Sequence, residues 1–114
     1  MKQRKISSAE DGEMTDYDFV KIFKALADQT RQEILELLGE QEMNVTDICS
    51  EFKVSQPTVS HHLHILKDCN LINYRKEGKS VYYYIERDVV NDVFGQVVRK
   101  MRIRIIEEEG THGE

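Results

Sequence analysis

Three histidines lie close together in the stretch "SQPTVSHHLHIL", residues 55–66, among small polar residues and two plain leucines. Imidazole side chains bind metal ions, transfer protons near neutral pH and form hydrogen bonds with other molecules. The cluster therefore allows three interpretations: a metal site, acid–base catalysis, or a hydrogen-bonding contact surface. The elements around the histidines must decide between them.

The charge of the chain is unevenly distributed. The chain has 114 residues, of which 39% are hydrophobic. This size and composition fit one small domain whose core is completed in part by a partner chain. The net charge of −5 alone argues against nucleic acid as a partner. However, residues 53–87 hold six basic and three acidic side chains, whereas residues 7–52 hold three basic and twelve acidic ones. The pattern favours a confined anion-binding face, with a solvated charged surface as the alternative.

Two amphipathic helices are predicted in the first part of the chain. Apolar residues recur at helical spacing in "TDYDFVKIFKALAD" and again in "TRQEILELLGE". The first helix, 16–27, begins at a Thr15-x-x-Asp18 capping pair, and the second is expected to stop at Gly39.

A helix-turn-helix unit is predicted next. "NVTDICSEFKV" forms a short helix with Thr46 as its cap. Ser55 then caps a helix over 56–68, with Pro57 in its first turn, where a missing N–H group has no cost. Two short helices joined by a tight turn form such a unit.

A β-hairpin over 71–86, with "KEGK" as its turn, adds a wing to this unit. Asp88 is expected to cap a long helix over 88–106, whose apolar stripe predicts packing against a second copy of the chain or against the first helix. We therefore predict a mainly α fold with a β-hairpin: a winged helix-turn-helix of about five helices plus a two-stranded wing. The predicted divisions are a flexible arm (1–14), the DNA-binding and dimerisation domain (15–106) and an acidic flexible tail (107–114).

Three segments together resemble a known family: "FKALADQTRQEILELL", "VTDICSEFKVSQPTVSHHLHILKDCNLI" and "YRKEGKSVYYYI". They are similar to the ArsR/SmtB winged-helix transcriptional repressors over roughly residues 17–94. Gln29 departs from the family, which often has proline there. The resemblance implies a homodimer on a pseudo-palindromic double-stranded operator, paired through the helix 88–106 and the helix 16–27. The helix 56–68 would enter the major groove, and the wing would follow the backbone or the minor groove.

The polar face of the helix 56–68 supplies candidate DNA contacts, because a helix N-terminus presents free N–H groups and a positive dipole to phosphate. Base-edge candidates are Gln56, Thr58, Ser60 and His61, and phosphate or sugar candidates are His62 and His64. In the wing, Arg75, Lys76 and Lys79 are expected to neutralise phosphates.

Metal binding and catalysis are less favoured uses of the histidines. His61 and His64 are three apart, but no third ligand follows at suitable spacing. Family metal sites are not intact, since the Cys-x-Cys pair is replaced by Asn44 and Thr46, and Cys69 lacks its companion cysteine. Zinc sensors of the family use an Asp-x-His near the start of the last helix, where this chain has only the aspartate. We predict no metal site, no cofactor and no enzymatic activity, because the usual catalytic signatures are missing.

The controlling signal stays open. A redox switch at Cys49 or Cys69 is one alternative, against the plainer interpretation of two small buried hydrophobic residues. A winged helix used for protein binding is a further alternative. No segment reaches the roughly 20 apolar residues needed to cross a bilayer, so we expect a cytoplasmic protein without a membrane partner.

Overall fold

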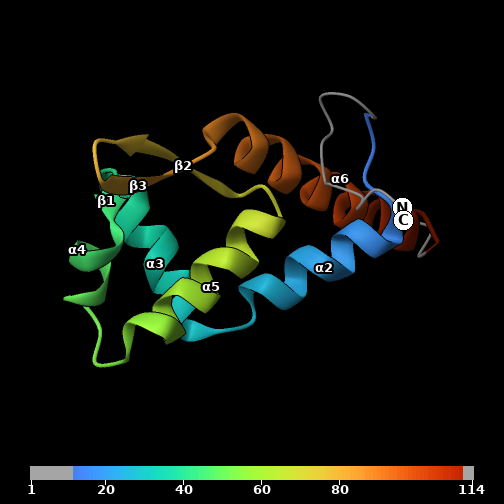
Figure 1. Cartoon of the computed structure of the whole chain (residues 1–114). Helices are drawn as coiled ribbons and strands as arrows, with labels where there is room; N and C mark the ends of the chain where they lie inside the picture. The colour runs from blue at the N-terminus through green and yellow to red at the C-terminus, as the bar shows by residue number, and fades with distance from the viewer. Residues whose placement is uncertain (1–11, 112–114) are drawn as a thin grey trace.

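The computed structural model of the chain describes the backbone of residues 12–111 and the side chains of residues 12–102. The described elements, shown in Figure 1, are α2 (Asp16–Leu26), α3 (Gln29–Glu40), β1 (Met43–Asn44), α4 (Val45–Cys49), α5 (Gln56–Asp68), β2 (Ile72–Glu77), β3 (Ser80–Ile85) and α6 (Arg87–Thr111). The predicted winged helix-turn-helix is confirmed. No helix in this part of the chain combines the length and apolar character needed to cross a membrane.

Two predicted helix starts are confirmed in detail. The Thr15 hydroxyl accepts a hydrogen bond from the backbone N–H of Asp18, and the Asp18 carboxylate accepts one from the backbone N–H of Thr15. Ser55 caps α5 by accepting from the backbone N–H of Thr58 at 3.3 Å, with Pro57 in the first turn. Each cap satisfies N–H groups that a helix leaves without an internal partner.

Three predicted helix ends are wrong. The cap of α4 is Asn44 and not Thr46, because the Asn44 side chain accepts a hydrogen bond from the backbone N–H of Asp47 at 2.8 Å. Gly39 does not end α3, which continues past it, so its conformational freedom is unused. Asp88 lies inside the first turn of α6 and is not its cap.

The inner face of α5 lies at the centre of the core. Val59, Leu63 and Leu66 have no exposed surface, as their helical spacing predicts. The other helices each contribute fully buried side chains to the same cluster: Ile22 from α2, Ile34 from α3, Ile48 from α4 and Val93 from α6. Burial of this much apolar surface fixes which face of α5 points outward.

The junction of α2 and α3 is closed by side chains of α3. Arg31 donates from Nε to the carbonyl of Ala25 at 2.6 Å and from Nη2 to that of Lys24 at 3.3 Å. Gln32 donates from Nε2 to the carbonyl of Leu26 at 2.7 Å. These three carbonyls belong to the last turn of α2, and that of Lys24 also accepts from the backbone N–H of Ala27 at 3.3 Å.

The wing is tied to the body by a strand that periodicity did not predict. The sheet order is β1-β3-β2, and Met43 of β1 pairs with Tyr83 of β3. Two residues are too few to show a strand pattern. The hairpin turns at Gly78, whose φ of +65° suits glycine, and the rings of Tyr74 and Tyr83 lie 5.6 Å apart across the strands.

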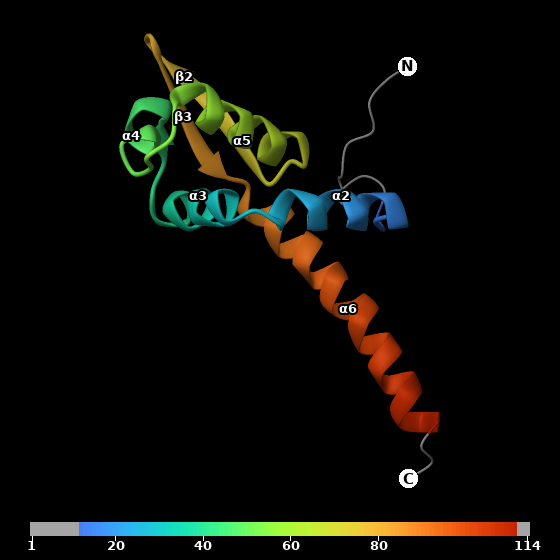
Figure 2. The same cartoon turned by 90° about the horizontal axis from the view of Figure 1, so that it is seen from below.

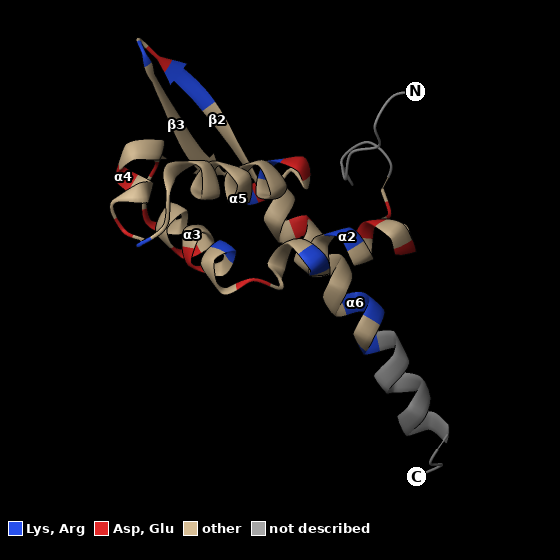
Figure 3. Ribbon diagram, turned by 60° about the horizontal axis from the view of Figure 1, so that its bottom comes forward, with Lys and Arg blue, Asp and Glu red and all other residues tan. Residues whose placement is uncertain are grey.

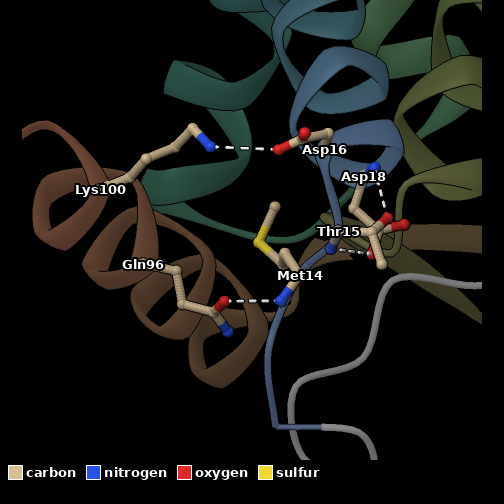
Figure 4. A network of polar contacts seen from close by, with 6 residues as sticks. All are labelled: Met14, Thr15, Asp16, Asp18, Gln96 and Lys100. Atoms are coloured by element: carbon tan, nitrogen blue, oxygen red, sulfur yellow. Dashed lines mark hydrogen bonds and ion pairs between the residues drawn. The ribbon is translucent and has the colours of Figure 1, made fainter.

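The N-terminal segment packs against α6 through Gln96, which is buried. The Gln96 side chain accepts from the backbone N–H of Met14 at 2.7 Å and donates to the carbonyl of Gly12 at 2.9 Å. Figure 4 shows Gln96 on α6 facing this segment. An amide side chain that satisfies both an N–H and a C=O group holds an extended backbone much as a neighbouring strand does.

These contacts shift both predicted domain boundaries. Met14 is part of the core, so the packed domain begins before residue 15. Helix α6 runs to Thr111, past the predicted end at 106, and its C-terminal half projects away from the other elements (Figure 2). The rest of the predicted arm, 1–11, and the end of the predicted tail, 112–114, lie outside the described residues.

Candidate nucleic-acid interface

The outward face of α5 is polar and exposed. We call it the reading face, and its members are Gln56, Thr58, Ser60, His61 and His64, all exposed. The structure thus brings five of the six candidates from this helix onto one surface. The hydroxyl of Thr58 lies 3.0 Å from that of Ser55, so it takes part in the cap as well.

His62 differs from its neighbours, because it is half-buried and contacts α3. Arg31 Nη1 lies 3.0 Å from His62 Nδ1. Arginine has only donors, so Nδ1 is the acceptor and the imidazole proton sits on Nε2. Burial lowers the pKa of His62, and the nearby charges of Arg31 and His61 lower it further, while Asp28 opposes them. This contact makes His62 a link between α5 and α3, and a direct contact with phosphate stays a prediction.

The Asp28 carboxylate supports the same link. It caps α3 by accepting a hydrogen bond from the backbone N–H of Arg31 at 3.1 Å, and this bond is the main cause of the lowered pKa of Asp28. Asp28 therefore stays ionised at neutral pH beside the guanidinium group of Arg31.

The basic side chains of the wing differ in whether they form ion pairs within the domain. Arg75 forms ion pairs with Glu42 and Glu77, each at 2.8 Å, and lies over the ring of Tyr82 at 5.1 Å. These partners raise its pKa, with the hydrogen bond to Glu77 as the first cause. Lys76 and Lys79 are exposed and have no ion-pair partner among the described residues. Figure 3 shows the basic colour along β2 and at the tip of the hairpin.

Acidic side chains lie on α3, on α4 and in the segment between them. Residues 32–52 contain six acidic and no basic side chains. Figure 3 shows these acidic positions on α3 and α4, away from the wing tip. Such a division repels a polyanion from one side of the domain and leaves the reading face and the wing tip accessible to it.

A shallow depression of about 220 Å³ lies between α4 and the wing. Thr46 lines it from α4, and Lys79 and Ser80 line it from the hairpin. Sequence reasoning missed Thr46 as a surface residue and gave no role to Arg31. Arg31 and His62 are 31 residues apart in the sequence, so no local pattern could have revealed their contact.

Cys69 is poorly placed for thiolate chemistry. Cys69 is buried, its Sγ lies 3.9 Å from the carbonyl oxygen of Lys21, and burial raises the pKa of its thiol. Reactive cysteines need the opposite environment, since the thiolate is the reacting form. Cys49 is half-buried. In the described part of the chain, no three His, Cys, Asp or Glu side chains gather as a metal-binding group.

Comparison with known proteins decides the family. The family model described as "Bacterial regulatory protein, arsR family" matches residues 28–74. The transcriptional repressor SdpR of Bacillus subtilis is 41% identical over 71 residues, which cover 62% of this chain and 79% of SdpR. The chain belongs to the ArsR family.

Other known proteins are similar to this chain over comparable lengths. An uncharacterised HTH-type transcriptional regulator of Methanocaldococcus jannaschii is 49% identical over 74 residues, or 64% of this chain and 83% of that protein. The crystal structure of an ArsR family transcriptional regulator superposes with a TM-score of 0.69 at 26% identity, covering 79% of this chain and 93% of that one. As an ArsR family protein, the chain is a DNA-binding transcriptional regulator and not an enzyme.

The partial burial of His62 beside Arg31 predicts that the domain is less stable in acid. Because the folded state lowers the pKa of His62, its contribution is complete above the unfolded pKa of about 6.5 and is lost as the pH falls through the lower folded value. We expect the melting temperature of the wild type to fall between pH 7.5 and pH 5. The variant His62→Gln keeps an acceptor for Arg31 but does not titrate, so it should show a smaller fall.

His64→Gln is the matched control, since it removes an exposed histidine of the same helix. It should retain the acid sensitivity of the wild type. Equal pH profiles for wild type and His62→Gln would show that protonation of His62 is not the cause of the acid sensitivity.

Proposed function

We propose that this ArsR family regulator is a homodimeric repressor that places α5 of each subunit in the major groove of a pseudo-palindromic operator. The observation that carries this proposal is the reading face: a polar, exposed helix surface on the side opposite a fully buried apolar one. A recognition helix of this kind contacts base edges with the residues near its N-terminus. SdpR, a relative, is named a transcriptional repressor, which supports the direction of control.

The side chains divide into base contacts and phosphate contacts. Gln56, Thr58, Ser60 and His61 lie in the first two turns of α5 and are proposed to contact base edges. His64 lies further along the helix and is proposed to contact phosphate or sugar. In the wing, Lys76 and Lys79 are the better candidates for phosphate, because the charge of Arg75 is already paired within the domain.

Dimer formation is supported by apolar side chains left exposed on two helices. Helix α6 has two apolar stripes: Val93 and Val97 are buried in the domain, while the second is exposed. The second stripe consists of Phe94, Val98 and Met101, spaced four and three residues apart, as in a helix–helix seam. Helix α2 adds Tyr17, Val20 and Phe23. A second copy would cover both surfaces symmetrically.

The signal is proposed to be something other than a metal held at the known sites of the family. Some relatives are named for cadmium or arsenical resistance, but Asn44 and Thr46 occupy the positions of the expected cysteine pair. The burial of Cys69 makes a redox switch the less favoured alternative.

The deciding experiment selects a DNA sequence from a random duplex library with the wild-type protein. Binding to the selected duplex and to a scrambled duplex is then measured across a salt series, with reduced protein, oxidised protein, zinc, cadmium and arsenite in separate arms. Preferential binding that weakens steeply with salt supports the proposal. Failure to enrich any sequence would contradict it.

If the side chains of the reading face contact bases, removing one of them should reduce the preference for the selected duplex. Ser60→Ala or His61→Ala should reduce the preference for the selected duplex over the scrambled one by about 1–3 kcal/mol, because each removes hydrogen bonds to base edges. The measurement is fluorescence anisotropy at one fixed salt concentration. Glu36→Gln, an exposed change on the acidic side, should keep the wild-type preference.

If the wing contacts phosphates, removing a wing lysine should weaken the binding of every DNA sequence alike. Lys79→Ala should weaken binding to both duplexes alike and reduce the salt slope by about 1 for each phosphate that is no longer neutralised. Arg75→Ala should change the slope less, because Glu42 and Glu77 already balance that charge. A Lys79→Ala effect restricted to the selected duplex would contradict the assignment of the wing.

If the exposed stripe of α6 forms the dimer interface, a charge introduced into the stripe should weaken the dimer. Val98→Glu should raise the dimer dissociation constant by about tenfold or more, because a carboxylate would be buried between two helices. Analytical ultracentrifugation over a concentration series measures this constant. Arg99→Gln makes the same change in net charge at the neighbouring exposed position, outside the stripe, and should leave the dimer unchanged. Equal dissociation constants for the two variants would place the interface elsewhere.

A further inference from the structure

The C-terminal end of α5 is joined to the middle of α2 by an ion pair. Lys21 Nζ lies 3.1 Å from Asp68 Oδ2, and the two side chains are 16% and 36% exposed. The ammonium nitrogen itself is buried. Neither residue belongs to the reading face or to the wing.

A second contact lies at the same place. The thiol of Cys69, the C-cap of α5, points its Sγ to within 3.9 Å of the carbonyl oxygen of Lys21. Asn70 follows with a φ of +63°, and the backbone N–H of Leu71 returns to the carbonyl of Leu66 at 3.2 Å, which closes the end of the helix. The charge of Lys21 therefore lies at the negative end of the α5 dipole, where a cation is favourable.

The apolar inner face of α5 fixes which side of the helix is buried, but apolar burial is not directional and sets its exact position less sharply than polar contacts do. A pair of charges at one defined distance is directional, and buried ionic contacts can contribute to conformational specificity more than to stability. The Arg31–His62 contact holds the middle of α5 from α3, and the Lys21–Asp68 pair holds its end from α2.

We propose that Lys21 and Asp68 are positioning residues that set the orientation of the reading face relative to α2. The inference rests on the proposed function, in which α2 also carries part of the dimer interface. The orientation of each α5 relative to its α2 then sets the spacing of the two reading faces, which must match successive major grooves about 34 Å apart. The pair would thereby control discrimination between operator and other DNA without contacting DNA.

The test uses the full chain, the selected duplex and the scrambled duplex. Lys21→Met and Asp68→Asn should each lower the ratio of the two affinities by about tenfold or more, because a recognition group must be held within about 0.5 Å of its working position. Binding to the scrambled duplex should stay near the wild-type value, because the wing lysines are untouched. The exchanged pair Lys21→Glu with Asp68→Lys should recover most of the discrimination.

Two controls match the charge changes. Lys24→Met removes an exposed lysine one turn away on α2, and Glu36→Gln removes an exposed carboxylate on α3. Both should discriminate as the wild type does. Melting curves and sedimentation are recorded for every variant, and a variant that melts early is assayed at a temperature where it is folded.

Three outcomes would overturn the inference. Lys21→Met and Asp68→Asn could discriminate as well as the controls, or the exchanged pair could fail to recover discrimination while remaining folded. A parallel loss of binding to both duplexes would mark the pair as a contact of general stability only. If the wild type enriches no sequence, the proposed function fails first, and that result is visible before any variant is made.

Discussion

The guanidinium group of Arg31 joins three helices at one point. It satisfies two carbonyls that end α2, it belongs to α3, and it reaches His62 on α5. A polar group that is buried without a partner costs about 1–3 kcal/mol, so the donor that Arg31 gives to the part-buried carbonyl of Ala25 stabilises the end of α2. The same side chain thereby holds α5 relative to the two helices at the start of the domain. The angle of the reading face depends on a contact that lies outside that face.

Charge separation gives the domain one side that can approach DNA. The acidic side chains of residues 32–52 lie on α3 and α4 and between them, and the exposed lysines Lys76 and Lys79 lie toward the hairpin tip. A protein with a net charge of −5 binds a polyanion only where its local potential is positive. Internal ion pairs refine this pattern, because the charge of Arg75 is balanced by Glu42 and Glu77.

Helix α6 packs against the core with one apolar stripe and exposes a second apolar stripe. Val93 and Val97 complete the core, and Gln96 holds the N-terminal segment in place through two backbone groups. Phe94, Val98 and Met101 remain uncovered within the chain. In the described part of the chain, α2 and α6 therefore each keep apolar side chains exposed, while the outward face of α5 is polar.

The sequence by itself determined the elements and the composition of the reading face. The period of Val59, Leu63 and Leu66 settled which side of α5 is buried, and the caps at Thr15 and Ser55 were predictable because each involves residues three positions apart. Only the tertiary structure decided the contacts of His62, Arg31, Lys21 and Asp68. Their partners lie 31 and 47 positions away, and such contacts depend on how all the helices pack together. Local periodicity does not show which polar residue of a helix contacts a residue far away in the sequence. The sequence pattern therefore did not distinguish His62 from His61 and His64.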